Sequence, residues 1–295
     1  TMGTPSNAVV GQHPVFVASI TESNIAPQVQ LAIEQAEVQT SIVVKGQGLI
    51  TVMAVVEDLN PSDEHSFDWT FTDSALLDSD ADEATFTFDP DVTEEGVYSI
   101  ALNVTDTAGN ITYSERLIQI LQEAPLLTDL DSDGDGVTDI IDGFMDVDGD
   151  GIPQYLDAVD KSYVLPAKTT VNSAYLVETH VGLQMSLGKV ARQLASDKAV
   201  LAVSEIAAIY PELDVTDLSF SSGLENLRVS GLSQLDTSIS IVVPQLIAIP
   251  NTPVYTNLSL NDLSWSPFVE DDANALYSAP GAQGYCPAPQ DDAYV

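Results

Sequence analysis

The residues of this sequence that could do chemistry are concentrated in one stretch of aspartates and glycines. Between residues 129 and 160, two segments fifteen residues apart repeat the spacing D-x-D-x-D-G, each with a carboxylate at its twelfth position. In a calcium loop of this kind, positions 1, 3 and 5 supply side-chain oxygens, position 7 supplies a backbone carbonyl, and position 12 closes the shell. The sequence therefore predicts calcium (Ca2+) as the cofactor.

The two copies divide the predicted ligands into two sets. The first set is Asp131, Asp133, Asp135, Asp139 and Asp142, with the carbonyl of Val137. The second set is Asp146, Asp148, Asp150 and Asp157, with the carbonyl of Ile152. Gly136 and Gly151 stand at position 6, where the chain must turn sharply. Gln154 stands in the second copy where Asp139 stands in the first, so we expect the second ion to bind more weakly or through a water.

A solvated acidic linker is the plainer interpretation, because runs of like charge repel and stay extended. Such a run would not place glycine at position 6 in both copies, each followed by Val or Ile. An EF-hand would have Glu at position 12 and a helix on each side, whereas here Asp fills that position and about three residues separate the loops. The stretch instead resembles the thrombospondin type 3 repeat, which implies a helix-poor chain wrapped around calcium.

Composition limits the classes of partner. With 45 acidic and 8 basic residues, the formal net charge is −37, so nothing could neutralise the phosphates of a nucleic acid, and an anionic membrane surface is disfavoured for the same reason. No apolar run is long enough for direct membrane insertion, and no signal peptide is present, so we expect Thr1 to be an internal or processed start. The acidity suits a salty, calcium-rich exterior where ions screen self-repulsion, and an apolar content of 44% is enough to build cores.

Residues 25–121 read as short strands separated by turns. Apolar alternation or β-branched residues predict strands at 29–33, 41–44, 50–56, 66–71, 84–88, 96–104 and 114–120. Seven strands in about 95 residues are typical of an antiparallel immunoglobulin-type sandwich. The segments F-D-W-T-F (67–71) and Y-S-I-A-L-N-V-T-D-T-A-G (98–109) resemble the PKD domain and related bacterial cadherin-like modules, which implies an extracellular spacer or binding module.

Two smaller features flank or interrupt this domain. Residues 1–24 form a tail with one strand-like run at 13–20, which either packs on its own domain or adds to the sheet edge of a neighbour. The acidic residues at 78–83 form either a solvated loop or another calcium site.

Residues 122–160, the calcium-binding linker, precede a second β-rich domain at 161–295. Strands are expected at 174–178, 183–187, 227–230, 237–243 and 254–260. A helix is expected at 204–209, with Ser204 as its cap and Pro211 as its stop. The predicted fold class is all-β: an immunoglobulin-like sandwich and a second β-rich domain joined by the linker.

The second domain resembles the bacterial choice-of-anchor family, type U. The resemblance rests on segments 175–180, 182–188 and 241–245 and on the Tyr- and Pro-rich segment 274–294. It implies a place near the C-terminus of a Gram-negative surface protein. In that family the counterpart of Cys286, the only cysteine, is followed by a second cysteine. We therefore expect the domain to be incomplete at its C-terminus, and Cys286 to be a disulfide candidate with a partner beyond Val295.

No catalytic constellation is evident in the sequence. The three histidines, His13, His65 and His180, fall in three different segments, and no nucleophile elbow, zinc spacing or phosphate loop is present. The first hypothesis is therefore not an enzyme but a calcium-stiffened extracellular structural or adhesion protein of a Gram-negative bacterial cell surface. It is expected to associate with itself, which would build a filament, or with another cell-surface protein; a monomeric spacer is the plainer form.

Two alternatives remain open. One is an accessory module of a secreted hydrolase that binds carbohydrate, such as a polysaccharide, or protein; exposed aromatic side chains in a row on one sheet face would favour it. The other is the stalk of an enzyme whose catalytic domain precedes Thr1.

Overall fold

The computed structural model describes residues 24–78, 83–168, 175–194, 197–215, 220, 223–232, 238–245, 254–280 and 286–294. Within these ranges the chain is built mostly from β-strands with a few short helices, which confirms the predicted all-β class. The strand predicted at 13–20 lies outside the described residues.

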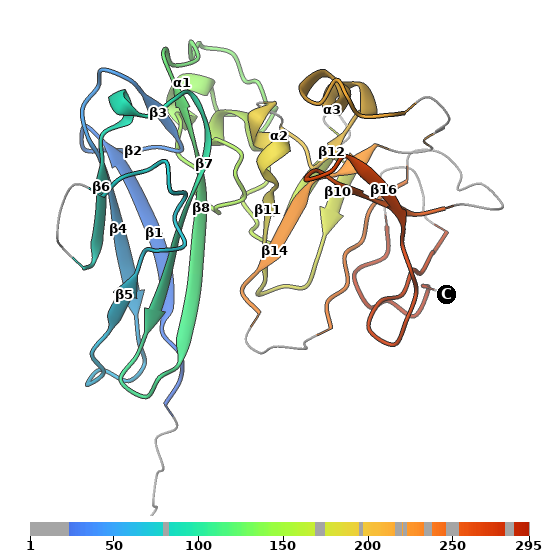
Figure 1. The fold of residues 1–295 in the computed structure, drawn as a ribbon, viewed down its shortest axis with the longest axis horizontal. Coiled ribbons are helices and arrows are strands. Elements are labelled where there is room, and N and C mark those ends of the chain that lie inside the picture. Colours follow the sequence, from blue (N-terminus) through green and yellow to red (C-terminus); the bar gives the residue numbers. More distant parts are fainter. Residues whose placement is uncertain are drawn as a thin grey trace, which may run out of the picture.

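The N-terminal domain consists of two four-stranded sheets (Figure 1). The first sheet has the order β2-β1-β4-β6 and contains β1 (Gln28–Gln35), β2 (Val38–Gln39), β4 (Ile50–Glu57) and β6 (Thr85–Phe88). The second has the order β3-β8-β7-β5 and contains β3 (Ile42–Val44), β5 (Ser66–Asp68), β7 (Gly96–Thr105) and β8 (Ile111–Leu121). Neighbouring strands are antiparallel, except that β3 runs parallel to β8.

Alternating apolar residues from both sheets fill the space between them. In β4, Ile50 and Val52 are fully buried while Met53 faces outward, as the two-residue period of a strand requires. From β7, Ile100 and Leu102 meet them in one core cluster. The Tyr98 hydroxyl donates a hydrogen bond to the Glu94 carbonyl (2.8 Å), which is the tyrosine corner of immunoglobulin-like sandwiches.

The strand predicted at 66–71 ends earlier, at Asp68. One oxygen of Asp68 accepts hydrogen bonds from the Thr70 N–H (3.0 Å) and hydroxyl (2.6 Å), which turns the chain away from the sheet. Trp69 nevertheless packs against the core, 5.6 Å from the Phe86 ring. A short 3-10 helix (Pro90–Val92) precedes β7.

The C-terminal half is assembled from four strand pairs. They are β9 (Val164–Lys168) with β10 (Tyr175–Glu178), β11 (Gln184–Leu187) with β14 (Leu227–Ser230), β12 (Val200–Leu201) with β13 (Leu224–Glu225), and β15 (Thr256–Ser259) with β16 (Ser264–Pro267). Leu165, Val177, Met185 and Leu201 are fully buried in a second core cluster.

Two predictions in this half need correction. In the described part of 237–243, only Val242 pairs, in an isolated bridge with Glu178, so a continuous strand there is wrong. Helix α3 (Val203–Ile209) contains Ser204 inside its first turn. The N-cap is Ala202, whose N–H donates to the Glu205 carboxylate (2.5 Å), so an acceptor three residues later replaces the expected hydroxyl cap. Helix α2 (Lys189–Gln193) was not expected.

The Asp-rich stretch lies between the two halves, with helix α1 (Asp139–Asp142) near the top of the view (Figure 1). It contains one further 3-10 turn, η2 (Gln154–Leu156). Towards the sandwich, the Phe144 carbonyl accepts a hydrogen bond from the Ser41 N–H (2.7 Å). Towards the C-terminal half, Ile152 belongs to the second core cluster. Across the described residues, no helix has the length and apolarity needed to cross a bilayer.

Candidate metal centre

Both D-x-D-x-D-G segments fold into the same hydrogen-bonded loop. At position 1 of the first loop (residues 131–142), one oxygen of Asp131 accepts from the Gly134 N–H (2.7 Å) and the other from the Gly136 N–H (3.1 Å). Asp146 does the same at position 1 of the second loop (residues 146–157), with Gly149 and Gly151. These four glycines have φ between 78° and 100°, a region that suits glycine because other side chains are strained there.

Positions 3 and 5 leave one carboxylate oxygen free of the loop backbone. The N–H of position 5 donates to position 3, and the N–H of position 7 donates to position 5, in both loops. As a result, three carboxylates converge in each loop with ligand oxygens within 4.8 Å of one another. The two groups are Asp131, Asp133 and Asp135, and Asp146, Asp148 and Asp150.

Some of the converging oxygens are buried without a hydrogen-bond partner. They are the Oδ2 atoms of Asp133, Asp148 and Asp150, and Asp150 has no solvent-exposed surface at all. Buried polar atoms in folded proteins are almost always satisfied, and an unpaired buried carboxylate is costly. Carboxylate oxygens are the ligands that hard divalent cations prefer. The residues present therefore fit a bound metal ion.

The electrostatics of the loops match this geometry. Burial, together with the nearby charges of Asp157 and Asp146, raises the pKa of Asp148 to about 7. Burial also raises the pKa of Asp133 to about 6 and that of Asp150 well above its usual range. A divalent cation would reverse these shifts because it stabilises the ionised carboxylates.

The position-12 aspartates lie against their own loops. Burial, followed by the charges of Asp135, Asp139 and Asp131, raises the pKa of Asp142. Asp157 is only 2% exposed, and burial raises its pKa to about 6, with Asp160, Asp146 and Asp133 adding to the effect. The influence of Asp133 on Asp157 indicates that the two loops are close enough for their charges to interact.

Position 9 is Asp139 in the first loop and Gln154 in the second, and the two side chains make different hydrogen bonds. Both oxygens of Asp139 accept hydrogen bonds from Ser132, one from its N–H and one from its hydroxyl (2.9 Å each). Asp139 therefore lies outside the group of three carboxylates. Gln154 donates from its amide nitrogen to Asp160 (2.7 Å), and its Oε1 is buried without a partner. Asp160, which the repeat spacing does not single out, thus joins the second loop.

The side chains at position 7, Val137 and Ile152, differ in how deeply they are buried. Val137 donates its N–H to Asp135 (2.7 Å) and its side chain is partly exposed. Ile152 donates its N–H to Asp150 (2.6 Å), but its side chain is 1% exposed and packs in the C-terminal core. The first loop is therefore largely at the surface and the second is built into the protein.

Sequence reasoning missed the positive charges around the second loop. Arg116 on β8 donates to the Gly149 carbonyl (3.3 Å). Arg192 on α2 is 1% exposed, and the charges of Asp146 and Asp150 partly offset the lowering of its pKa by burial. The signal in the sequence was composition: the chain has three arginines, and two of them face this loop.

A third acidic group lies at the end of the sandwich where β7 turns into β8. Asp58, Asp63 and Asp106 place ligand oxygens within 4.8 Å of one another. Unlike the loops, this group has no carboxylate oxygen that is buried without a hydrogen-bond partner: His65 lies 2.8 Å from Asp58, Asn24 donates to Asp63, and Asn110 donates to both oxygens of Asp106. No regular spacing relates these residues, so no sequence pattern points to this group.

The remaining predicted features have ordinary surroundings. Cys286 is partly buried, and burial followed by the charge of Glu178 raises the pKa of its thiol. The ring of His180 accepts a hydrogen bond from the Ser240 N–H (2.8 Å). His13, Asp80 and Asp82 lie outside the described residues.

Comparison with known proteins finds similar solved structures. The chain is similar to the PKD1 domain of Vibrio anguillarum Epp, with 17% sequence identity over 35% of this chain and 100% of that domain, and a TM-score of 0.24. No protein-family model and no curated protein sequence matches the chain.

Proposed function

We propose that this chain is a calcium-binding, extracellular structural protein of a Gram-negative bacterial surface, which acts through association and not through catalysis. One observation carries the calcium assignment: Asp150 is completely buried between two other carboxylates, and its Oδ2 has no hydrogen-bond partner. Ca2+ accepts about six to eight oxygen ligands in flexible geometry, whereas Mg2+ demands near-ideal octahedral geometry, so carboxylate-rich loops of this kind suit Ca2+ better.

The extracellular setting is supported by charge and by calcium supply. Between residues 129 and 160 there are eleven aspartates and no basic residue, so the ion-free stretch repels itself. Calcium at the millimolar levels typical of extracellular modules would hold such loops closed. The resemblances to PKD, thrombospondin type 3 and choice-of-anchor sequences point to the same setting.

The alternative of a polysaccharide-binding accessory module receives less support. Among the described residues, the exposed aromatic side chains are Phe71, Tyr255 and Tyr277. They come from three separate segments and do not lie in a row on one sheet face. A stiff spacer or assembly unit therefore explains more of the chain than a carbohydrate-binding face does.

Calorimetry tests the calcium assignment. The chain is stripped with chelator and titrated with CaCl2, with MgCl2 as the control. We expect binding of at least two calcium ions and weaker binding of magnesium. Each site should stabilise the folded form by about 2.7 kcal/mol at a hundredfold excess of calcium over its Kd. Absence of binding heat, together with a melting temperature that EDTA leaves unchanged, would refute the proposal.

Sedimentation velocity tests association. We expect larger species in calcium than in EDTA, because neutralised loops reduce repulsion between copies of so acidic a chain. Monomers under both conditions would leave the calcium-stiffened spacer as the function and remove self-assembly.

A further inference from the structure

One carbonyl oxygen of the second loop is shared by the two halves of the protein. The Gly149 carbonyl accepts a hydrogen bond from Arg116 Nη1 on β8 (3.3 Å) and another from Gln184 Nε2 on β11 (2.9 Å). Gly149 stands between Asp148 and Asp150, two of the three converging carboxylates. The backbone that presents those carboxylates therefore also presents the acceptor that joins sandwich and C-terminal half.

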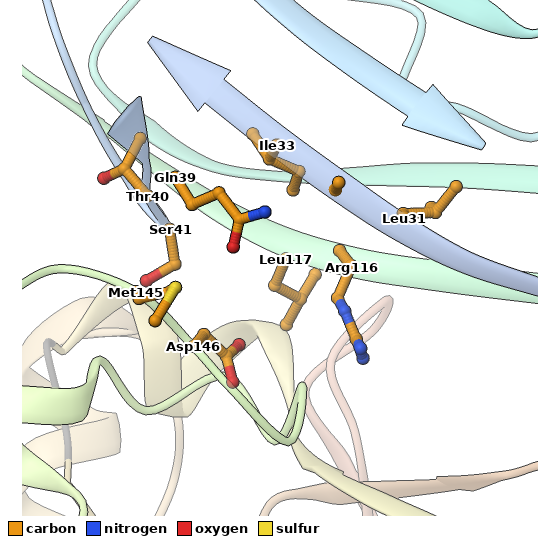
Figure 2. Close-up of a pocket in the computed structure, with 10 residues that line it drawn as sticks. Leu31, Ile33, Gln39, Thr40, Ser41, Arg116, Leu117, Met145 and Asp146 are labelled. Carbon is orange, nitrogen blue, oxygen red and sulfur yellow. The ribbon is translucent and has the colours of Figure 1, made fainter. Parts of the chain in front are cut away.

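Further contacts fix the second loop from both sides. The Asp150 carbonyl accepts from the Leu187 N–H (2.6 Å) on β11. On the sandwich side, Arg116 and Asp146 flank Leu117 in a cavity of about 50 Å³ (Figure 2). A methyl group added to Gly149 would overlap the Arg116 guanidinium, and one added to Gly151 would lie 3.3 Å from Arg192 Cδ.

The equivalent positions of the first loop are open. A methyl group added to Gly134 or Gly136 would meet no atom within 4 Å. Asp131 and Asp135 are exposed. The two loops thus share their internal hydrogen bonds but differ in what surrounds them.

Two ion pairs also join the halves, and Arg228 in addition lies over the Tyr113 ring, 5.3 Å from its centroid. Lys189 pairs with Asp73 (3.2 Å) and Arg228 pairs with Glu115, and in each pair the basic side chain is about half exposed. Exposed ion pairs are screened by salt and hold geometry poorly. A cavity of about 130 Å³ between the halves is lined by Lys189 and Arg228 and by Gly149 of the loop.

We propose that the second loop couples calcium to the orientation of the two domains, whereas the first loop is an exchangeable local site. This inference rests on the proposed calcium binding. Without a cation, the carboxylates of Asp146, Asp148 and Asp150 are buried close together, and once ionised they repel one another at short range, which destabilises the closed loop. Opening of the loop turns the Gly149 peptide, so Arg116 and Gln184 lose their shared acceptor and the domains separate. Emptying the first loop leaves that acceptor in place.

Matched substitutions at position 3 test this coupling. Asp148→Ala and Asp133→Ala each remove one ligand from one loop, and small-angle X-ray scattering reports the domain arrangement with calcium and with EDTA. We expect each variant to bind one ion fewer than the native chain. Asp133→Ala in calcium should keep the native compact profile. Asp148→Ala in calcium should give the same more extended profile that we expect for the native chain in EDTA.

The outcomes separate the two proposals. If the native chain binds no calcium, the proposed function fails. If both variants lose an ion but scatter alike, calcium binding stands and the coupling is wrong.

A second matched pair leaves every carboxylate intact and covers the case in which Asp148→Ala does not fold. Gly149→Ala and Gly134→Ala both place a methyl group at positive φ, but only the first displaces Arg116. In calcium, Gly149→Ala should scatter as the extended form, whereas Gly134→Ala, which carries the same strain in the other loop, should scatter as the native form. A compact Gly149→Ala chain would overturn the coupling.

Discussion

Truncation of Ile152 to alanine should destabilise the C-terminal domain even though it removes no predicted calcium ligand. Position 7 of the loop contributes its backbone carbonyl, which alanine retains. The Ile152 side chain, however, is 1% exposed and lies in the same core cluster as Leu187 and Val190. The equivalent truncation in the first loop, Val137→Ala, changes a partly exposed side chain and serves as the matched control.

The size of the effect follows from burial. Ile→Ala removes three carbons, and at about 0.8 kcal/mol per buried carbon the lost transfer free energy is roughly 2.4 kcal/mol. The cavity that remains adds to this, so the free energy of unfolding should fall by about 2–5 kcal/mol. Val137→Ala removes two carbons from a site that water already reaches, so it should cost less than about 1.6 kcal/mol.

Urea denaturation followed by tryptophan fluorescence measures this difference. The chain has two tryptophans: Trp69 packs on the sandwich core and Trp265 on the C-terminal core. In a Trp69→Phe background, the emission reports only the domain that contains Ile152. Saturating calcium keeps both loops occupied, so that stability and ion binding are not confounded.

Two results would refute the reasoning. Equal losses in the two variants would mean that the second loop is no more buried than the first. A loss below about 1 kcal/mol for Ile152→Ala would mean that its side chain is not part of the core.

Two more predictions concern pH and the thiol. In the calcium-free folded protein, Asp148 holds its proton up to about pH 7, and Asp133 and Asp157 hold theirs up to about pH 6, whereas the unfolded chain releases them near 3.8. These groups therefore make the ion-free fold less stable as pH rises from about 4 to 7. Calcium affinity should increase over the same range because protons no longer compete for the carboxylates. Calorimetry at about pH 5 and 7.5 measures this affinity, and a pH-independent value would contradict the prediction. Burial and Glu178 raise the pKa of Cys286, so iodoacetamide should alkylate it more slowly in the native chain than in urea; equal rates would show that the thiol is not shielded.

The sandwich and the two loops could be predicted because both follow local rules. Alternation at every second residue marks β4 and β7 before any partner strand is known. The loop spacing works in the same way, since glycine at positions 4 and 6 and aspartate at 1, 3 and 5 are enough to form the hydrogen bonds around Asp131 and Asp146. The predicted N-cap of α3 was wrong because a local contact favours another residue. Ser204 is the better cap by residue type, but the Glu205 carboxylate accepts a hydrogen bond from the Ala202 N–H, and Ala202 is the N-cap.

What could not be predicted depends on residues distant in sequence. Asp58 and Asp106 meet only because the turn after β4 and the turn after β7 lie at the same end of the sandwich. Gln184 reaches the Gly149 carbonyl from 35 residues away, and Arg116 reaches it from 33. No periodicity relates such positions, and without the fold they are indistinguishable from surface residues.

The placement of the arginines shows why two copies of one motif need not be equivalent. In a chain with 45 acidic residues, a guanidinium could pair almost anywhere. Yet Arg116 and Arg192 face the second loop, and Arg228 pairs with Glu115 across the same junction. A guanidinium keeps its charge when buried and directs several donors at once, so it can hold a carbonyl and offset nearby carboxylates together. Identical ligand spacing thus sets where a cation can bind, whereas the surrounding arginines and core residues determine what its binding would move.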